Sequence, residues 1–315
     1  MKVIYGIGRV KQQLSDTGGV LAIGVFDGLH RGHKRLIEKA VRQARKREVI
    51  SIVMTFYPHP VNILNPDIYL PAIVSLPYRL KLIASLGVDV CVVVRFTKRF
   101  ASMLPDNFIR RYIIKTIAPA EIFIGTDFRF GRDRMADADY LQERVAPFGI
   151  KVNVVSFITL GGHKIGSNDI RKMIAVGQLK QASILLGRPV SIMGKVSKGD
   201  RQGRRLGFPT ANIIPDDEVL PPVGVYASRV IIGNEKFGAM SYIGTKPTFS
   251  LRNRVRIEVY IFDLRQELYG KEIIVEFIEK IRDEKRFSSP AALAEQLTKD
   301  LAQTKMVLRR RGYNK

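Results

Sequence analysis

The chain has 315 residues, more than the roughly 100 to 200 of an ordinary single domain, so two folded cores are the first expectation. Hydrophobic residues make up 46% and charged residues 26%, a globular composition that excludes disordered and collagen-like chains. The formal net charge of +23 favours an anionic partner, such as a phosphorylated small molecule, a nucleic acid or a membrane surface.

Several features bear on where the protein works. The single cysteine, Cys91, excludes an internal disulfide, and the opening residues lack the apolar stretch of a signal peptide. Charges interrupt the apolar runs well before the roughly 20 residues that span a bilayer. We therefore expect a cytoplasmic protein without a membrane helix, in which Cys91 is a small buried hydrophobe.

The first part of the chain alternates short β-branched runs with helical stretches. Strands are predicted at residues 20–26, 51–57, 88–96, 120–126 and 152–157, and helices from the Gly/His loop to about Lys46 and at residues 78–86 and 106–115. This alternation predicts a Rossmann-like parallel sheet. A helical region at residues 169–186 ends at Gly187 and Pro189, where we place the boundary between domains 1–186 and 187–315.

The second part of the chain has a different texture. Short strands separated by glycine and proline turns are predicted at residues 191–196, 224–232, 237–243, 255–262 and 272–277. A final helix, at residues 290–308, carries apolar residues at helical spacing. The pattern predicts a small antiparallel β-barrel or sandwich with a terminal helix packed on it, and of the two we expect the barrel.

Three of the four histidines lie in two short segments: His30 and His33 in GVFDGLHRGH, and His59 in TFYPHP. The first segment follows a predicted buried strand, at the edge of an open α/β sheet where nucleotides bind. Its glycines allow close backbone approach to a ligand, and the following helix directs its positive end towards a phosphate. By itself, a His-x-x-His pair also fits a polar loop or half of a metal site.

The segment resembles the HxGH signature of nucleotidyltransferases, and GVFDGLHRGH resembles the opening motif of the prokaryotic bifunctional riboflavin kinase/FAD synthetases. TFYPHP, IGTDFRFG and IGSNDIR follow in the order of that family. The resemblance implies attack of the FMN phosphate on the α-phosphate of ATP, with His30 and His33 as catalytic donors and His59 on the flavin side. The implied ATP-binding residues are Gly24, Phe26, Asp27, His30, His33, Asp127, Ser167 and Arg171.

Two departures from the family pattern concern this first module. Gly166, Ser167 and Asn168 stand where the family usually has Ser-Ser-Thr. After DFRFG the family usually has a basic residue and Gly-Asp, whereas this chain has Arg134, Met135, Ala136 and Asp137. Each lost hydroxyl removes a hydrogen bond worth about 1 kcal/mol. One alternative is therefore a first module that binds nucleotide or flavin without turning over, in a protein with kinase activity only.

A second patterned stretch, GKVSKGDRQGRRLGFPTANI at residues 194–213, is rich in glycine and basic residues. Such a loop suits phosphates, and by composition alone it also suits RNA. GFPTAN resembles the PTAN motif of riboflavin kinases. The resemblance implies an ATP and Mg²⁺ site with Thr210 and Asn212 as neutral metal ligands, and no transition metal. Its residues are Lys195, Gly199, Gly207, Pro209, Thr210 and Asn212.

Later motifs extend the resemblance. Glu258 in RIEVYIFD matches the catalytic carboxylate that takes the proton of the ribityl 5′-hydroxyl, although between Ile257 and Val259 it also fits a surface strand position. IRDEKRF, at residues 281–287, implies Arg282, Glu284 and Phe287 on the flavin side.

The sequence thus predicts two reactions: riboflavin and ATP give FMN in the second module, and FMN and ATP give FAD and pyrophosphate in the first. The expected partners are riboflavin, FMN, FAD and ATP. An RNA-binding protein is a further alternative, suggested by the charge and by the HxGH signature of tRNA synthetases, but no basic anticodon-like helical domain accompanies it. The basic cluster Arg309, Arg310 and Arg311 exceeds what two nucleotide sites require.

Overall fold

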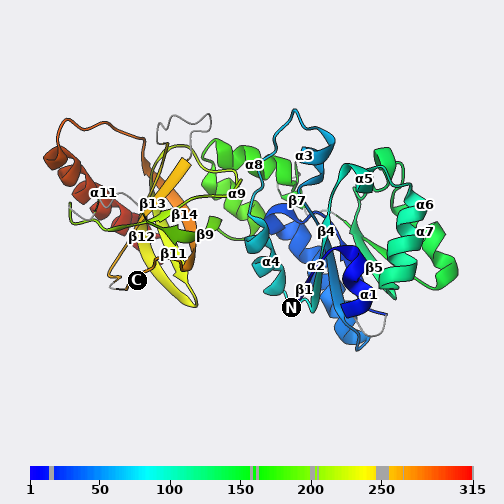
Figure 1. Ribbon diagram of the computed structural model, residues 1–315. Coiled ribbons are helices and arrows are strands. Elements are labelled where there is room, and N and C mark those ends of the chain that lie inside the picture. The colour runs from blue at the N-terminus through cyan, green and yellow to red at the C-terminus, as the bar shows by residue number, and fades with distance from the viewer. Residues whose placement is uncertain are drawn as a thin grey trace. The chain divides into compact units, whose positions relative to one another are not determined.

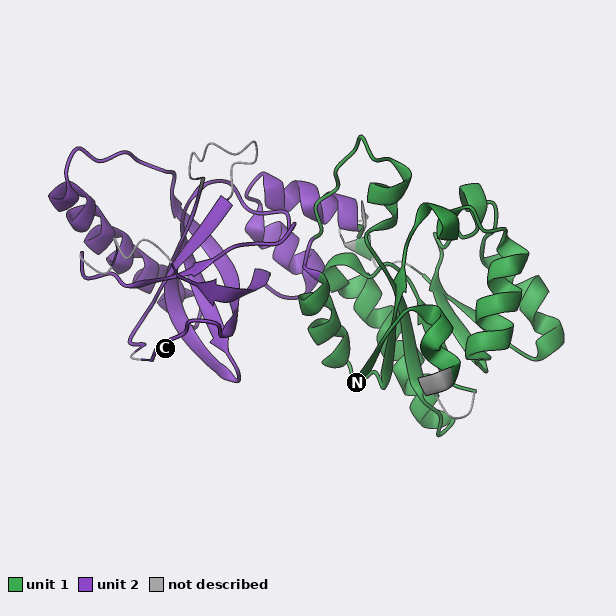
Figure 2. Ribbon diagram, in the orientation of Figure 1, with its two compact units in different colours: residues 1–72, 76–166 green, residues 73–75, 167–315 purple. Residues whose placement is uncertain are grey.

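The computed structural model describes residues 1–13, 18–156, 159–160, 163–198, 203, 206–245, 255–264 and 266–313. These residues form two compact units (Figure 2). Unit 1 comprises residues 1–72 and 76–166, and unit 2 comprises residues 73–75 and 167–315. The helical region before Gly187 therefore clusters with the second unit, and the functional boundary at Leu186 stays a prediction.

Unit 1 is built on a parallel sheet. Among the described residues its six strands run in the order β1-β4-β3-β2-β5-β6, and every neighbouring pair is parallel. The strands are β1 (Lys2–Tyr5), β2 (Val20–Ile23), β3 (Ser51–Tyr57), β4 (Val90–Arg95), β5 (Glu121–Gly125) and β6 (Lys151–Val155). The predicted Rossmann-like sheet is confirmed, with β1 as a strand that the sequence analysis missed.

Helices cover both faces of this sheet (Figure 1). Successive residues of β2 enter opposite cores: Leu21 and Ile23 pack in one, and Val20 and Ala22 in the other. Both faces are therefore apolar, which explains why the strands are continuous hydrophobic runs. The helices are α1 (Val10–Gln13), α2 (Arg31–Lys46), α3 (Pro60–Leu64), α4 (Leu76–Ala84), α5 (Lys98–Ala101), α6 (Pro105–Phe108), a π-helix (Ile109–Ile117) and α7 (Ala138–Val145); β7 (Thr159–Leu160) and β8 (His163–Lys164) form a small hairpin.

Unit 2 is a closed antiparallel barrel whose described strands run in the order β10-β13-β12-β11-β14-β9. The strands are β9 (Val190–Ser197), β10 (Thr210–Ile213), β11 (Gly224–Ile232), β12 (Glu235–Thr245), β13 (Val255–Ile261) and β14 (Glu272–Arg282). Two short helices, α8 (Ser167–Ala175) and α9 (Leu179–Leu186), precede the barrel. The predicted barrel is confirmed, and β10 is an additional strand.

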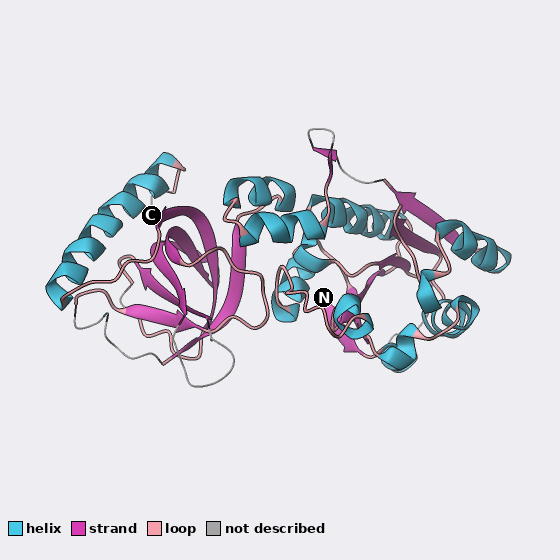
Figure 3. Cartoon of the chain, turned by 90° about the horizontal axis from the view of Figure 1, so that it is seen from above, coloured by secondary structure: helices cyan, strands magenta, loops and turns pink. Residues whose placement is uncertain are grey.

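The last helix, α11 (Pro290–Arg310), lies along the outside of the barrel (Figure 3). Ser289 caps its first turn by accepting from the Ala292 N–H. Val307 and Leu308 are buried in one cluster with Val225, Ala227 and Met240 of the barrel wall. The terminal helix thus covers part of the barrel's outer surface, as predicted. Within the described residues, no helix is long and apolar enough to cross a bilayer.

Candidate active sites

The loop that follows β2 has an unusual backbone. Phe26, Gly28 and Leu29 have φ angles of 52°, 74° and 41°, in the region that favours glycine. A Cβ atom on Gly24 would lie 2.8 Å from the Phe26 ring, and one on Gly32 would lie 3.1 Å from the His30 ring. Gly24 and Gly32 are therefore required by packing within the protein, because a larger side chain at either position would collide with a ring of the motif itself.

A buried ion pair lies beside this loop. Asp27 and Arg79 are each 1% exposed, and Nη2 of Arg79 in α4 lies 3.7 Å from Oδ1 of Asp27. Nη1 of Arg79 also donates to the Val25 carbonyl at 3.0 Å and to the Phe56 carbonyl at 3.2 Å. One guanidinium thus links Asp27 to the backbone at the ends of two neighbouring strands. Arg79 could not be predicted as part of the site, because nothing in its local sequence distinguishes it from an exposed helical arginine.

His30 and His33 meet at the start of α2. His30 is the N-cap, and its Nδ1 accepts from the His33 N–H at 3.4 Å. The two rings are stacked with centroids 3.6 Å apart, and the Phe26 ring meets His33 edge-on. Burial, followed by the neighbouring His30 and Arg79, holds the pKa of His33 well below its usual value. His33 is therefore a neutral imidazole at the positive end of a 16-residue helix.

One polar atom of this pair is unsatisfied. His33 Nδ1 is buried and has no hydrogen-bond partner among the described residues. A buried polar atom without a partner is costly, and at a helix N-terminus a bound anion is the ligand that the surroundings favour. This atom is the strongest local sign that the motif holds a phosphate.

The sheet order brings three predicted segments to one edge. β2 lies between β3 and β5, and all three strands are parallel, so the loops after them share the carboxyl edge. His59 follows β3 and caps α3 by accepting from the Val61 N–H at 3.2 Å. Asp127 follows β5 and is exposed. Because the strand order changes direction between β2 and β5, this edge is the switch point where nucleotides bind in open α/β sheets.

The remaining predicted residues of the first module, Ser167 and Arg171, lie on α8 in unit 2. Arg171 is buried, and its Nη1 donates to Oδ1 of Asn168 at 2.7 Å. Asn168, one of the departures from the family pattern, is thus a partner of the predicted phosphate-binding arginine. The other departure, Ala136, is buried in unit 1 and closes the DFRFG loop through paired backbone hydrogen bonds with Phe130.

The predicted kinase residues come together through strand register. Asn212 of β10 lies opposite Glu258 of β13, and Thr210 lies opposite Tyr260. Side chains two residues apart on a strand share a face, so Thr210, Asn212 and Glu258 lie on the same side of the wall. Ile257 and Val259 alternate with Glu258 and are fully buried, which identifies their side as the barrel interior. The polar row therefore lies on the barrel's outer face.

The loop before this row carries the other predicted ATP residues. Gly207 has a φ of 83°, and the Gly203 carbonyl accepts from the Phe208 N–H at 2.8 Å. Pro209 and Lys195, the latter on β9, are exposed. Gly199 lies outside the described residues. Gly203 and Phe208 are therefore held together by their backbones immediately before Thr210.

The end of β14 and the segment after it hold the predicted flavin residues. Arg282 forms an ion pair with Asp300 of α11 at 2.8 Å, and its guanidinium lies over the Phe287 ring at 5.6 Å. Asp300 is 1% exposed. Glu284 is exposed and accepts a hydrogen bond from the Tyr242 hydroxyl. Arg282 thus anchors the segment to the terminal helix, and Tyr242 of β12, which the sequence analysis missed, links it to the barrel.

Part of the basic cluster at the end of α11 is engaged within unit 2. Arg310 and Arg311 form ion pairs with Glu279 at 2.7 Å and 2.9 Å. Arg229 adds an ion pair to Glu276 at 2.6 Å and lies over the Tyr313 ring. These contacts attach the end of the terminal helix to the barrel, which gives Arg310 and Arg311 a structural role outside the two nucleotide sites.

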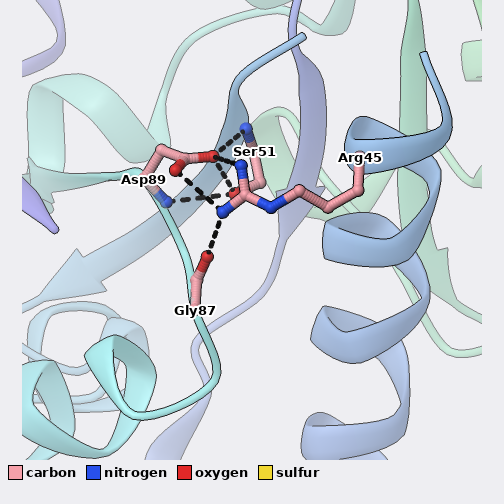
Figure 4. A network of polar contacts seen from close by, with 4 residues as sticks. All are labelled: Arg45, Ser51, Gly87 and Asp89. Atoms are coloured by element: carbon pink, nitrogen blue, oxygen red, sulfur yellow. Dashed lines mark hydrogen bonds and ion pairs between the residues drawn. The ribbon is translucent and has the colours of Figure 1, made fainter. Parts of the chain in front are cut away.

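The far end of α2 is anchored at the opposite, amino edge of the sheet. Arg45 forms an ion pair with Asp89 at 3.0 Å and donates to the Gly87 carbonyl, while Asp89 also accepts from Ser51 (Figure 4). These contacts lower the pKa of Asp89 although its partial burial opposes them. Arg47 forms a second ion pair, 2.8 Å long, with Glu121. The helix that presents His30 and His33 is therefore fixed at both ends.

Comparisons with known proteins follow the same division. Residues 12–169 match the family model described as FAD synthetase, and residues 186–308 match the one described as riboflavin kinase. A protein of Escherichia coli strain K12 named bifunctional riboflavin kinase/FMN adenylyltransferase is 37% identical over 301 residues, covering 95% of this chain and 96% of that protein. A protein of the same name from Listeria monocytogenes is 35% identical over 312 residues, covering 97% and 98%.

A solved structure extends the likeness to the fold of nearly the whole chain. It is titled a macrolide-efflux protein from Streptococcus pneumoniae and has a TM-score of 0.83 and 33% identity, covering 97% of this chain and 99% of that one. Both family models, the relatives and this structure agree on a chain with two modules. The chain belongs to the family of bifunctional riboflavin kinase/FMN adenylyltransferases.

Proposed function

We propose that this protein makes FMN from riboflavin at a site in residues 187–315 and FAD from FMN at a site in residues 1–186, with ATP as the donor in both reactions. The family membership supports the pair of activities. The observation that carries the assignment to two sites is that each unit has its own constellation: the stacked His30–His33 pair in one and the opposed Asn212–Glu258 pair in the other.

The kinase reaction transfers the γ-phosphoryl group of ATP to the ribityl 5′-hydroxyl of riboflavin. Glu258 accepts the hydroxyl proton as the oxygen–phosphorus bond forms, and the bond from the γ-phosphorus to the bridging oxygen breaks to release ADP. Its half-buried position beside Asn212 supports this role, because the proton acceptor and the proposed metal ligand then face one reacting phosphate.

Mg²⁺ is the metal that these side chains fit. Thr210 and Asn212 share the outer face of β10, and their neutral oxygens suit an ion whose remaining ligands are phosphate oxygens and water. When bound, the ion neutralises charge on the phosphates during transfer. Gly203 and residues 206–208, with exposed Lys195 on β9, would hold the triphosphate. Gly199 is assigned to the same loop from the family motif.

The flavin of the kinase reaction is assigned to the last residue of β14 and the segment after it. Arg282, Glu284 and Phe287 are its proposed contacts, and the ion pair from Arg282 to buried Asp300 supports a fixed position for the segment. In this assignment the barrel wall carries the chemistry, and the segment that α11 holds orients the ring system.

The adenylyltransferase reaction needs charge stabilisation more than a nucleophile. An oxygen of the FMN phosphate attacks the α-phosphorus of ATP, and the bond to the bridging oxygen breaks to release pyrophosphate. His30 and His33, with the backbone N–H groups at the start of α2, donate to the phosphate oxygens as charge accumulates. The unpaired Nδ1 atom of His33 supports this role.

The other proposed contacts of this reaction follow the family motifs. Gly24, Phe26 and Asp27 shape the nucleotide loop, Asp127 accepts from the ribose, and His59 lies on the flavin side. Ser167 and Arg171 are assigned to the phosphates from the IGSNDIR motif, and the Asn168–Arg171 hydrogen bond supports a role for Asn168 in holding the arginine. The intact loop and histidine pair favour an active first module over one that only binds ligand.

One assay tests the whole proposal. Purified protein is incubated with riboflavin, ATP and Mg²⁺, and FMN and FAD are resolved by chromatography over time. FMN should rise first and FAD should follow. Accumulation of FMN without FAD would show that the protein has kinase activity only. Salt-dependent RNA binding without any flavin product would favour the RNA-binding alternative.

A further inference from the structure

Tyr242 lies where the separately predicted parts of the kinase site converge. In the register of the barrel, Tyr242 of β12 is directly opposite Glu258 of β13, which is itself opposite Asn212 of β10. The three residues form one cross-strand row on the outer face. Paired side chains in such a row are about 5 Å apart at Cβ, so Tyr242 is an immediate neighbour of the proposed proton acceptor.

The tyrosine ring is held close to the barrel wall. A Cβ atom on Gly244 would lie 2.4 Å from the ring and hydroxyl of Tyr242, so any larger residue at 244 would displace the tyrosine. Tyr242 is half-buried, and its ring also packs against the cluster formed by the barrel wall and α11. Its hydroxyl is therefore presented from a fixed ring.

That hydroxyl makes a polar contact with the proposed flavin segment. It donates to Oε1 of Glu284 in the segment after β14. Burial of Tyr242, then its hydrogen bond to Glu284 and the charges of Glu284 and Glu258, raise the pKa of its hydroxyl, while Arg282 opposes this shift. The phenol thus stays protonated at neutral pH. Because a tyrosine has one proton to donate, its bond to Glu284 leaves the Glu258 oxygens available to a substrate hydroxyl.

A second tyrosine of the same barrel, Tyr226, has a hydroxyl that serves only the packing of the barrel. Tyr226 of β11 is fully buried and donates to the Pro222 carbonyl, so its hydroxyl satisfies the backbone of its own unit. Tyr242 instead donates to an exposed carboxylate on an irregular segment. Its bond fixes the position of that segment relative to the polar row.

We propose that Tyr242 is a positioning residue for riboflavin in the kinase reaction: by donating to Glu284, it holds residues 282–287 across the barrel face that carries Glu258. The proposal rests on the assignment of the kinase reaction to this face. It concerns substrate placement before the chemical step, so the loss of the hydroxyl should affect KM for riboflavin more than kcat.

The test is a double-mutant cycle in the full-length protein with Tyr242→Phe and Glu284→Ala. Tyr242→Phe should raise KM for riboflavin about fivefold or more, leave kcat within about twofold, and leave FAD formation from supplied FMN unchanged. In the Glu284→Ala background the same substitution should add less than about twofold, because its partner is already gone. Tyr269→Phe is the matched control, since Tyr269 is exposed in the same unit.

Each outcome decides the proposal. Effects of the two substitutions that multiply would show that Tyr242 does not act through Glu284. A fall in kcat with unchanged KM, or a shift in thermal unfolding that accounts for the lost activity, would also overturn it. Glu284→Gln keeps an acceptor for the Tyr242 hydroxyl. In that background, Tyr242→Phe should therefore raise KM for riboflavin nearly as much as it does in the wild-type protein. If the wild-type protein forms no FMN, the proposed function itself has failed.

Discussion

The two candidate sites are assembled in different ways. In unit 1 the principal residues lie within one stretch, 24–33, where left-handed backbone and the start of α2 bring Phe26, His30 and His33 together. In unit 2 the row Asn212, Glu258 and Tyr242 comes from three strands, and only their register makes the residues neighbours. The first site therefore depends on its loop backbone and a buried ion pair, whereas the second depends on individual side chains on a stable wall.

The sharpest way to test this contrast is to remove the proton acceptor of the barrel site. Glu258→Gln keeps the size of the side chain and should slow FMN formation by about 10²- to 10⁴-fold, the usual contribution of a general base. FAD formation from supplied FMN should be unchanged. The assay measures initial rates of both products, with Glu267→Gln as an exposed carboxylate control. An FMN rate within threefold of wild type would contradict the role of Glu258.

The stability of unit 1 should instead depend on the buried ion pair between Asp27 and Arg79. Arg79→Met breaks the buried ion pair with Asp27 and the bonds to the Val25 and Phe56 carbonyls, which costs about 3 kcal/mol or more. Cys91 reports this loss, because it is fully buried in β4 and its thiol pKa is raised to about 12. Thiol labelling through transient unfolding of unit 1 should become about a hundredfold faster, while FMN formation persists.

The control for that experiment is Arg35→Met, which removes an exposed arginine from α2. Labelling rates equal in the two variants would show that the Asp27–Arg79 pair does not support unit 1. Parallel loss of FMN formation would show that the two units do not fail independently.

The loop backbone gives a smaller effect. Gly24→Ala places a methyl group 2.8 Å from the Phe26 ring, and the ring must shift beside His33. Overpacking of this kind costs about 1 to 3 kcal/mol, so FAD formation should fall about tenfold. Gly8→Ala, where a Cβ meets nothing within 4 Å, is the matched control. Normal FAD formation by the Gly24 variant would show that the packing of the Phe26 ring beside His33 does not control the geometry of the loop.

The smallest expected effect is on pH dependence. The folded state lowers the pKa of His33, so the unfolded chain binds this proton more readily. Stability from the neutral His33 is present above the ordinary value near 6.5 and is lost as pH falls from there towards the folded pKa. Urea unfolding of unit 1 at pH 7.5 and 5.5 should show a smaller loss of stability in His33→Gln than in wild type. Equal losses would contradict the assignment.

Much of the fold could be predicted from the sequence, because the strands of both units carry strong local patterns. The pattern of residues 224–232 predicts a strand, and these residues form β11, whereas β1 and β10 have only four residues each and depend on pairing with β4 and β13. The helical region at 169–186 divides into α8 and α9 because Gly177, with a φ of 79°, ends the first helix.

The site residues also differ in whether the sequence alone can predict them. The His30–His33 pair lies within one motif, and its residue types and spacing alone are enough to propose it. Arg79 and Tyr242 could not be found in this way, because the first acts through a buried contact between elements and the second through strand register. Motifs thus indicate the residues of a site, and tertiary contacts are needed to find those that hold them in place.

The measurement closest to the central claim of two separate sites is a crossed assay of Asn212→Ala and His33→Ala, each supplied with riboflavin or with FMN. Folding of each variant is checked by protection of Cys91 and by thermal unfolding. Asn212→Ala should lose FMN formation and still convert supplied FMN to FAD, whereas His33→Ala should form FMN and fail to make FAD. If either substitution abolished both reactions in a folded protein, the assignment of one reaction to each constellation would be wrong.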